Sequence, residues 1–344
     1  MKNFKWIILV LPVLFFIGTS FASHSYVFTS VGVVTDEPST ILEKKIVFDN
    51  MDVPVYFARS SWVAARAIPY GHIFEEYPQW ALSYISIPRL FTADYLVYRD
   101  FFVLMNGVCY LLLALFLFLI LKKSGNVNRF FLLLLPSFLF FTFNRFDIFV
   151  ALLIVASYYF LLNKKDYVSF SLLGFAVLTK WFPLIFLPIY FIYLFNREKI
   201  RPAKWIYLSL SFLLPIVLPL LVTLLTAGFA GLVQPYVFHF SRLVEPYSTL
   251  SFLSVSQLLL PFFFYLQLAG AILPFFWVKI SNQKILILYL TLGVLFFVFF
   301  GRIYSPQFIV WFLPFLLLVL IGRELWLLVI YDIVNYITYY WSYL

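Results

Sequence analysis

Long apolar runs follow one another along almost the whole chain, and this pattern decides the class of fold. Hydrophobic residues make up 64% of the 344 residues and charged residues only 11%, whereas about a quarter of a soluble domain is charged. Such a chain lacks the polar surface needed to enclose a core in water, but helices that satisfy their own backbone can span a bilayer. We therefore predict an all-α polytopic membrane protein, folded as a single domain over residues 1–344.

The apolar runs predict about ten to eleven transmembrane helices, since a straight span takes about 20 residues. The first run is either an uncleaved helix or a signal peptide, because Ser20-Phe21-Ala22 resembles a cleavage site. We expect an uncleaved helix, since the apolar core continues through Phe21. The runs lie at about 5–22, 100–121, 130–144, 147–163, 168–179, 183–195, 205–227, 250–278, 285–300, 306–321 and 325–342.

Basic residues fall on every second connection between these runs, and they set the expected orientation. The positive-inside rule places that side in the cytoplasm, together with the N-terminus. It also accounts for the formal net charge of +9 without a nucleic-acid partner. The opposite connections, which include the long segment 24–98, are then extracytoplasmic loops of a multi-pass protein of the cell membrane. The cytoplasmic set is Lys2, Lys5, Lys122, Lys123, Arg129, Lys164, Lys165, Arg197, Lys199, Arg201, Lys204, Lys279, Lys284 and Arg323.

Two parts of the chain are expected to shape the extracytoplasmic side. Segment 24–98 predicts two amphipathic helices, at about 54–64 and 80–87, that lie on the membrane surface with their aromatic side chains down. The runs 168–179 and 183–195 are too short for ordinary spans. They predict a re-entrant pair that presents Lys180 at the outer interface, where a lysine is costly unless it faces a polar cavity or a partner.

The ionisable side chains that remain after the cytoplasmic set gather on the extracytoplasmic side. The candidates among them are Asp49, Asp52, Glu75, Glu76, Arg145, Asp147, Lys180, His239, Arg242, Glu245 and Arg302. Carboxylates beside cations at a membrane interface suit group transfer from a lipid phosphate. The carboxylate can take the proton of an acceptor hydroxyl, while the cations hold the leaving phosphate.

Four stretches in a fixed order carry a resemblance to a known family. They are Asp52-x-x-x-Tyr56 with Pro69-Tyr70 and Glu76-Tyr77-Pro78; Asn144-Arg145-Phe146-Asp147; Gly174 with Thr179-Lys180-Trp181-Phe182-Pro183; and Arg302-Ile303-Tyr304-Ser305-Pro306-Gln307 with Trp311 and Pro314. Over about residues 49–315 the chain resembles the GT-C-fold glycosyltransferases, and among them the polyprenol-phosphate-mannose-dependent mannosyltransferases. The resemblance implies a GT-C-like bundle and an inverting transfer of a sugar, expected to be mannose. The donor would be a polyprenyl-phosphate sugar and the acceptor a glycolipid or glycan hydroxyl, without a metal or other cofactor.

The resemblance also implies roles for individual residues. Asp52 is the expected catalytic base, and Asp49, three residues earlier, is the alternative. Lys180, Arg302 and Arg145 are the expected ligands of the donor phosphate, with an ion pair to Asp147 as the alternative role of Arg145. The other candidates for contacts with the sugar or the acceptor are Tyr56, Tyr70, Glu76, Tyr77, His239, Arg242, Tyr304 and Gln307.

Other classes of function stay open at this point. A lipid-linked glycan transporter or flippase typically shows internal repeats and polar groups near the bilayer midplane. A glycan polymerase or ligase more typically depends on arginine and histidine than on an early aspartate, and a non-catalytic membrane subunit is the last alternative. The single cysteine, Cys109, excludes an internal disulfide and a cysteine-based metal site.

Overall fold

The computed structural model describes residues 52–198, 201–242, 259–277 and 279–341. Every named element in these residues is a helix, which confirms the predicted all-α class, and one isolated bridge pairs Pro69 with Ile73. The predicted first run 5–22 and Asp49 lie outside the described residues. The elements are α2 (Asp52–Arg59), α3 (Ser61–Ala65), α4 (Gln79–Ser86), η1 (Ile87–Leu90), α5 (Tyr95–Lys123), η2 (Val127–Leu134), α6 (Pro136–Asn144), α7 (Asp147–Leu162), α8 (Asp166–Thr179), η3 (Phe182–Ile185), α9 (Phe186–Arg197), α10 (Pro202–Ser241), α12 (Leu260–Trp277), α13 (Gln283–Phe299), η5 (Pro306–Phe308), α14 (Ile309–Val319) and α15 (Glu324–Trp341).

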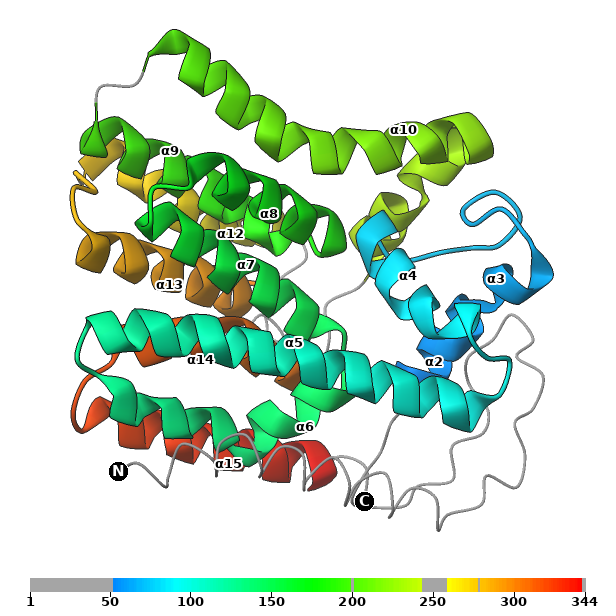
Figure 1. Ribbon diagram of the computed structural model, residues 1–344, viewed down its shortest axis with the longest axis horizontal. Coiled ribbons are helices and arrows are strands. Elements are labelled where there is room, and N and C mark those ends of the chain that lie inside the picture. Colours follow the sequence, from blue (N-terminus) through cyan, green and yellow to red (C-terminus); the bar gives the residue numbers. More distant parts are fainter. Residues whose placement is uncertain (1–51, 199–200, 243–258, 278, 342–344) are drawn as a thin grey trace.

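The long helices run side by side and alternate in direction (Figure 1). α7 packs against both α5 and α8, α10 packs on α8, and α13 packs against both α12 and α14. The turns from α5 to η2, α7 to α8, α9 to α10, α12 to α13 and α14 to α15 lie at one end of this bundle, on the left of Figure 1. Lys2, Lys5 and Lys199 lie outside the described residues, and the other basic residues that the sequence places in the cytoplasm lie in or beside these turns. We call this the basic end.

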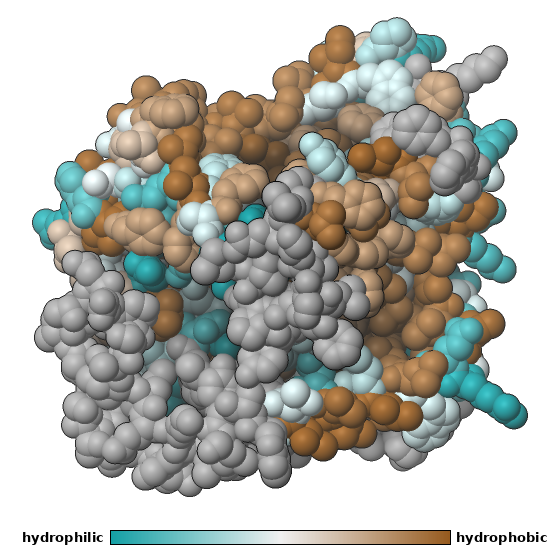
Figure 2. Space-filling view, turned by 180° about the vertical axis from the view of Figure 1, so that it is seen from behind, coloured by the Kyte–Doolittle hydropathy of each residue, from teal (hydrophilic) through white to brown (hydrophobic). Residues whose placement is uncertain are grey.

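The outer surface of the bundle is apolar. Figure 2 shows hydrophobic residues over much of the visible face, and hydrophilic residues along its right edge, the side on which the basic end lies after the rotation. α10 leaves Leu218 56% exposed and Leu225 76% exposed, and α5 leaves Leu104 53% exposed. Contiguous apolar surface of this kind is a liability in water and suits contact with lipid chains.

Full-length membrane spans are fewer in the described residues than the predicted ten to eleven. α5 and α10 are each long and apolar enough to cross a membrane, and η2 with α6 makes a third if that bent pair counts as one span. Six shorter apolar helical segments have 10–17 residues. The predicted short pair, α8 and α9, is therefore not distinguished by its length, since α7 has only 16 residues and α13 has 17.

The predicted straight span 130–144 is broken in its middle. Leu135 is extended, with φ −61° and ψ 138°, and η2 and α6 meet there at 64°. The cause is Pro136, because a proline disfavours helical geometry in the residue before it. Arg129, expected in the cytoplasm, is only 8% exposed and donates from Nη1 to the carbonyl oxygen of Leu317 at 3.1 Å.

The predicted extracytoplasmic loop 228–249 is helical in its first part. Gly228 has φ 70° and ψ −175°, a conformation that glycine adopts without a steric penalty, and α10 continues beyond this break to Ser241. Figure 1 shows the second half of α10 turning toward α4. There Gln234 accepts a hydrogen bond from the backbone N–H of Glu75 at 2.9 Å. The break therefore lets the second half of α10 pack against the segment that carries Glu75.

The two amphipathic helices predicted in segment 24–98 exist as α2 with α3, and as α4. Their apolar faces pack on the bundle, since α2 contacts α5 and α4 contacts α8, so the aromatic side chains that were expected to face lipid face protein instead. Tyr56 is 1% exposed and Tyr84 6%, and Trp80 donates from Nε1 to the carbonyl oxygen of Pro215 at 2.7 Å. α2, α3 and α4 together form a cap on the bundle, at the end opposite the basic end.

The contact between α8 and α10 depends on Gly174. A Cβ atom at this position would collide with the carbonyl oxygen of Phe212 in α10. Small residues permit such close backbone approach, and van der Waals packing at these points holds helices together in lipid. α8 ends at Thr179, so this contact also fixes the position of Lys180, the next residue.

Candidate active site

One cavity of about 1100 Å³ lies where the helix ends opposite the basic end meet the cap. Ligand pockets commonly hold about 300–1,000 Å³, so there is room for a large substrate. Eleven of the twelve candidate residues that the structure describes line it: Asp52, Tyr56, Glu76, Tyr77, Arg145, Lys180, His239, Arg242, Arg302, Tyr304 and Gln307. The twelfth, Tyr70, is buried beside it and donates its hydroxyl to the carbonyl oxygen of Tyr77 at 2.7 Å.

Asp52 is anchored by one of its oxygens and open to the cavity. It is the first residue of α2, where the helix N-terminus favours a carboxylate. Its Oδ2 lies 2.7 Å from Arg145 Nε and accepts a hydrogen bond from the Tyr56 hydroxyl at 3.4 Å, while 36% of the side chain stays exposed. Burial, followed by the nearby charge of Asp52, raises the pKa of Tyr56 well above its usual value, so the hydroxyl keeps its proton and donates.

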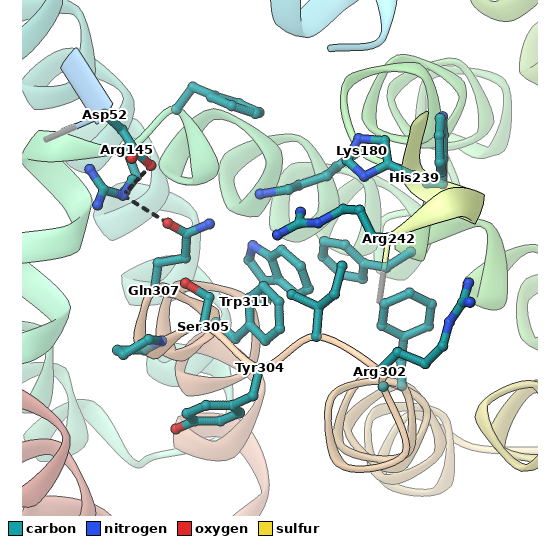
Figure 3. Close-up of a pocket in the computed structure, with 18 of the residues that line it drawn as sticks. Asp52, Arg145, Lys180, His239, Arg242, Arg302, Tyr304, Ser305, Gln307 and Trp311 are labelled. Carbon is teal, nitrogen blue, oxygen red and sulfur yellow. Dashed lines mark hydrogen bonds and ion pairs between the residues drawn. The ribbon is translucent and has the colours of Figure 1, made fainter. Parts of the chain in front are cut away.

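Arg145 joins three distant segments of the chain. It sits between α6 and α7, pairs with Asp52 of α2, and donates from Nε to Gln307 Oε1 of η5 at 2.8 Å. Figure 3 shows Asp52, Arg145 and Gln307 together on one side of the cavity, and we call these three residues the acid pole. The sequence offered Asp147 as an ion-pair partner of Arg145, but the ion pair of Asp147 is with Lys180.

Three of the predicted cations lie across the cavity from Asp52. Figure 3 shows Lys180 on that side, with Arg242 and Arg302 below it, and we call these three residues the cationic pole. They come from the α8–η3 connection, the end of α10 and the α13–η5 connection. His239 lies beside Lys180, but burial, followed by the nearby charge of Arg242, lowers its pKa to about 4, so its imidazole is neutral at neutral pH. His239 Nε2 also lies 3.1 Å from the carbonyl oxygen of Glu76, which ties the end of α10 to the cap.

Lys180 has both the partner and the polar cavity that its position demands. Its Nζ donates to Asp147 Oδ1 at 2.5 Å, and the Trp311 indole Nε1 donates to the same oxygen at 2.5 Å. The ammonium also lies 4.9 Å from the ring centroid of Phe146 and 4.8 Å from that of Trp311, within reach of a cation–π attraction. Asp147 is fully buried. It therefore fixes the ammonium at the cavity wall.

Of the two neighbouring glutamates, only Glu76 lines the cavity. Its Oε1 lies 3.7 Å from Arg59 Nε, and burial raises the pKa of Glu76 against the lowering effect of Arg59. Glu75 is fully buried, and burial raises its pKa to about 8. Sequence reasoning missed Arg59, although a basic residue on the extracytoplasmic side is unusual under the positive-inside rule.

α15 supplies a wall of the cavity that sequence reasoning missed. The Tyr304 hydroxyl lies 2.6 Å from that of Tyr331 and donates to Asn335 Oδ1 at 3.2 Å. Asn335 Nδ2 donates to the carbonyl oxygen of Pro306 at 3.0 Å, and Asp332 accepts two backbone N–H groups at the start of α6, each at 3.0 Å. Polar residues inside an otherwise apolar run are the signal that could have revealed this wall.

The cavity is suited to an anion. Five lysine and arginine side chains line it, against two carboxylates, and a cleft lined by one sign of charge concentrates ligands of the opposite sign. Among the residues that the structure describes, no group of three or more His, Cys, Asp and Glu side chains could hold a metal ion.

Comparison of the chain with protein-family models, with curated proteins and with solved structures finds no match.

Proposed function

We propose that this membrane protein is an inverting glycosyltransferase that uses a polyprenyl-phosphate sugar. The observation that carries the proposal is the division of one cavity between Asp52 on one side and the cationic pole on the other. A sugar phosphate held between them has its phosphate on the cations and its anomeric carbon toward Asp52. The sugar is expected to be mannose and the acceptor a glycolipid or glycan. We place the cavity on the extracytoplasmic side, since the basic turns occupy the other end.

The proposed step is a single displacement. The acceptor hydroxyl oxygen forms a bond to the anomeric carbon, and the bond from that carbon to the phosphate oxygen breaks. The electron pair of the broken bond leaves with polyprenyl phosphate, whose charge the cationic pole balances. The hydroxyl proton passes to Asp52, which is exposed enough to meet the acceptor. One displacement inverts the anomeric centre.

The edge of the cavity supports a substrate carried by a lipid. Leu327, Ile330 and Val334 of α15 line the cavity and are 68%, 56% and 54% exposed. They present apolar surface continuous with the polar interior of the cavity. A lipid chain can therefore stay against apolar side chains while its phosphate and sugar reach the charged residues.

The test is an assay of the purified protein against polyprenyl-phosphate mannose, glucose, galactose and arabinose, with consumption of each donor measured. Asp52→Asn should abolish transfer of the sugar. The variant should still bind the donor and should still elute as a folded protein. The matched control is Asp94→Asn, because Asp94 caps the start of α5 on the surface and asparagine can make the same cap. Full activity of Asp52→Asn would contradict the mechanism.

A further inference from the structure

Arg145 is built into the wall of the cavity more firmly than a substrate ligand needs to be. It is 5% exposed. Its Nε lies 2.7 Å from Asp52 Oδ2 and 2.8 Å from Gln307 Oε1, and its Nη1 donates to the carbonyl oxygen of Asn144 at 3.2 Å. Two of its nitrogen atoms, Nε and Nη1, are thus directed to oxygen atoms of the protein, and one of these oxygens belongs to the expected catalytic base.

The backbone at Arg145 is fixed by Asn106, which lies within the long helix α5. Asn106 is fully buried, and its Nδ2 donates to the carbonyl oxygens of Phe143 at 2.9 Å and Arg145 at 3.2 Å. Its Oδ1 accepts the hydroxyl of Tyr84 at 2.7 Å. A buried amide in an apolar span is costly unless it is hydrogen-bonded. Here its bonds hold the α6–α7 connection that carries Arg145.

The cationic pole is organised differently. A ligand of the donor phosphate must bind and release a headgroup in every turnover, so it needs donors that face the cavity. Lys180 keeps 23% of its side chain exposed and can point two further N–H groups away from Asp147. Arg302 is half-buried and forms no hydrogen bond or ion pair with another residue in the described parts of the chain.

We propose that Arg145 is a positioning residue for Asp52 and not a ligand of the donor phosphate. This role rests on the proposed glycosyl transfer. The guanidinium group, held by Gln307, holds Asp52 by Oδ2 and leaves Oδ1 to take the proton of the acceptor hydroxyl. Arginine suits this task because its planar group holds two oxygen partners in a fixed geometry. The donor phosphate is left to the cationic pole, which contains the two other expected ligands, Lys180 and Arg302.

The test compares Arg145→Gln with Arg302→Gln, since both remove one positive charge from the same cavity. For Arg145→Gln we expect kcat to fall roughly 100-fold, because a misplaced reacting group costs about that much. The donor KM and the directly measured donor Kd should stay within about twofold, as expected when only the transition state is affected. For Arg302→Gln we expect the donor KM to rise roughly tenfold or more, from the loss of a charged hydrogen bond.

A raised donor KM in Arg145→Gln with kcat preserved overturns the positioning role, and so does an unchanged kcat. If Arg145→Gln does not fold, Gln307→Ala takes its place, since it frees Arg145 without changing the charge of the cavity. Its kcat should fall at constant donor KM, and an unchanged kcat again overturns the role. Lack of turnover by the wild-type protein with every donor instead overturns the proposed function itself.

Discussion

Replacing Glu75 by glutamine should stabilise the protein at neutral pH and remove a pH dependence. Glu75 is fully buried, and its carboxylate oxygens accept no hydrogen bond from the residues that the structure describes. Burial raises its pKa from 4.5 to about 8, against the lowering effect of Arg59. The folded protein therefore keeps this proton over a pH range in which the unfolded chain has lost it.

The sign and size of the effect follow from these two pKa values. Between pH 4.5 and 8 the folded state binds more protons than the unfolded state, so stability is full below 4.5 and falls as pH rises through the window. At 1.36 kcal/mol per pH unit, the loss is roughly 3 kcal/mol by pH 7 and about 5 kcal/mol by pH 8. Glutamine does not ionise, so Glu75→Gln should gain up to roughly 3 kcal/mol at pH 7 and nothing at pH 4.5.

The measurement is the unfolding midpoint of the detergent-solubilised protein from pH 4.5 to 8, together with limited proteolysis of residues 66–78. Proteolysis is included because Glu75 anchors this segment to α10 through Gln234, and such segments can open locally. Glu324→Gln is the matched control, since Glu324 is exposed at the start of α15. A Glu75→Gln protein that keeps the pH slope of the wild type would refute the reasoning.

Two further predictions concern the basic end. Asp166 is 3% exposed and pairs with Arg197 and Lys204 at 2.7 and 2.8 Å. Both cations keep Glu198 as a second partner, so Asp166→Asn should lower the free energy of unfolding by about 1–3 kcal/mol. The measurement is the unfolding midpoint, which should fall while the donor KM stays unchanged. In intact cells, a membrane-impermeant thiol reagent should label His72→Cys and spare Lys164→Cys, because these exposed residues lie at opposite ends of the bundle. The reverse labelling pattern would put the cavity in the cytoplasm.

The sequence predicted which residues lie at the same end of the bundle. Successive helices alternate in direction, so the order of the apolar runs along the chain is enough to assign each connection to one end. Asp52, Lys180 and Arg302 lie on connections of the same parity, and antiparallel helices bring such connections to one end. The pairing within the cavity could not be predicted in this way. Asp147 is two residues from Arg145, yet its ion pair is with Lys180, because the α6–α7 connection directs the two side chains to different neighbours.

The predictions of the fold that failed did so because single residues change the backbone geometry inside apolar runs. Pro136 bends a run that hydropathy alone treats as continuous. At Gly228 the prediction failed in the opposite way. The apolar run was predicted to end at residue 227, but α10 continues beyond the break at Gly228 to Ser241. The amphipathic pattern of α4 identified a helix correctly, but an apolar face can be covered by lipid or by protein. Only the packing against α8 shows that protein covers it.

The bond between Asn335 and the Pro306 carbonyl has a consequence for how the protein is made. Membrane proteins emerge from the ribosome N-terminus first, so Asp52 and the cap are synthesised long before α15. The segment that carries Gln307 gains its hydrogen bond from Asn335 only when this helix joins the bundle. The complete set of contacts around the cavity is therefore assembled only when α15, which follows the other lining helices in the chain, has been inserted. A chain caught before that point would carry its reactive aspartate without a finished site around it.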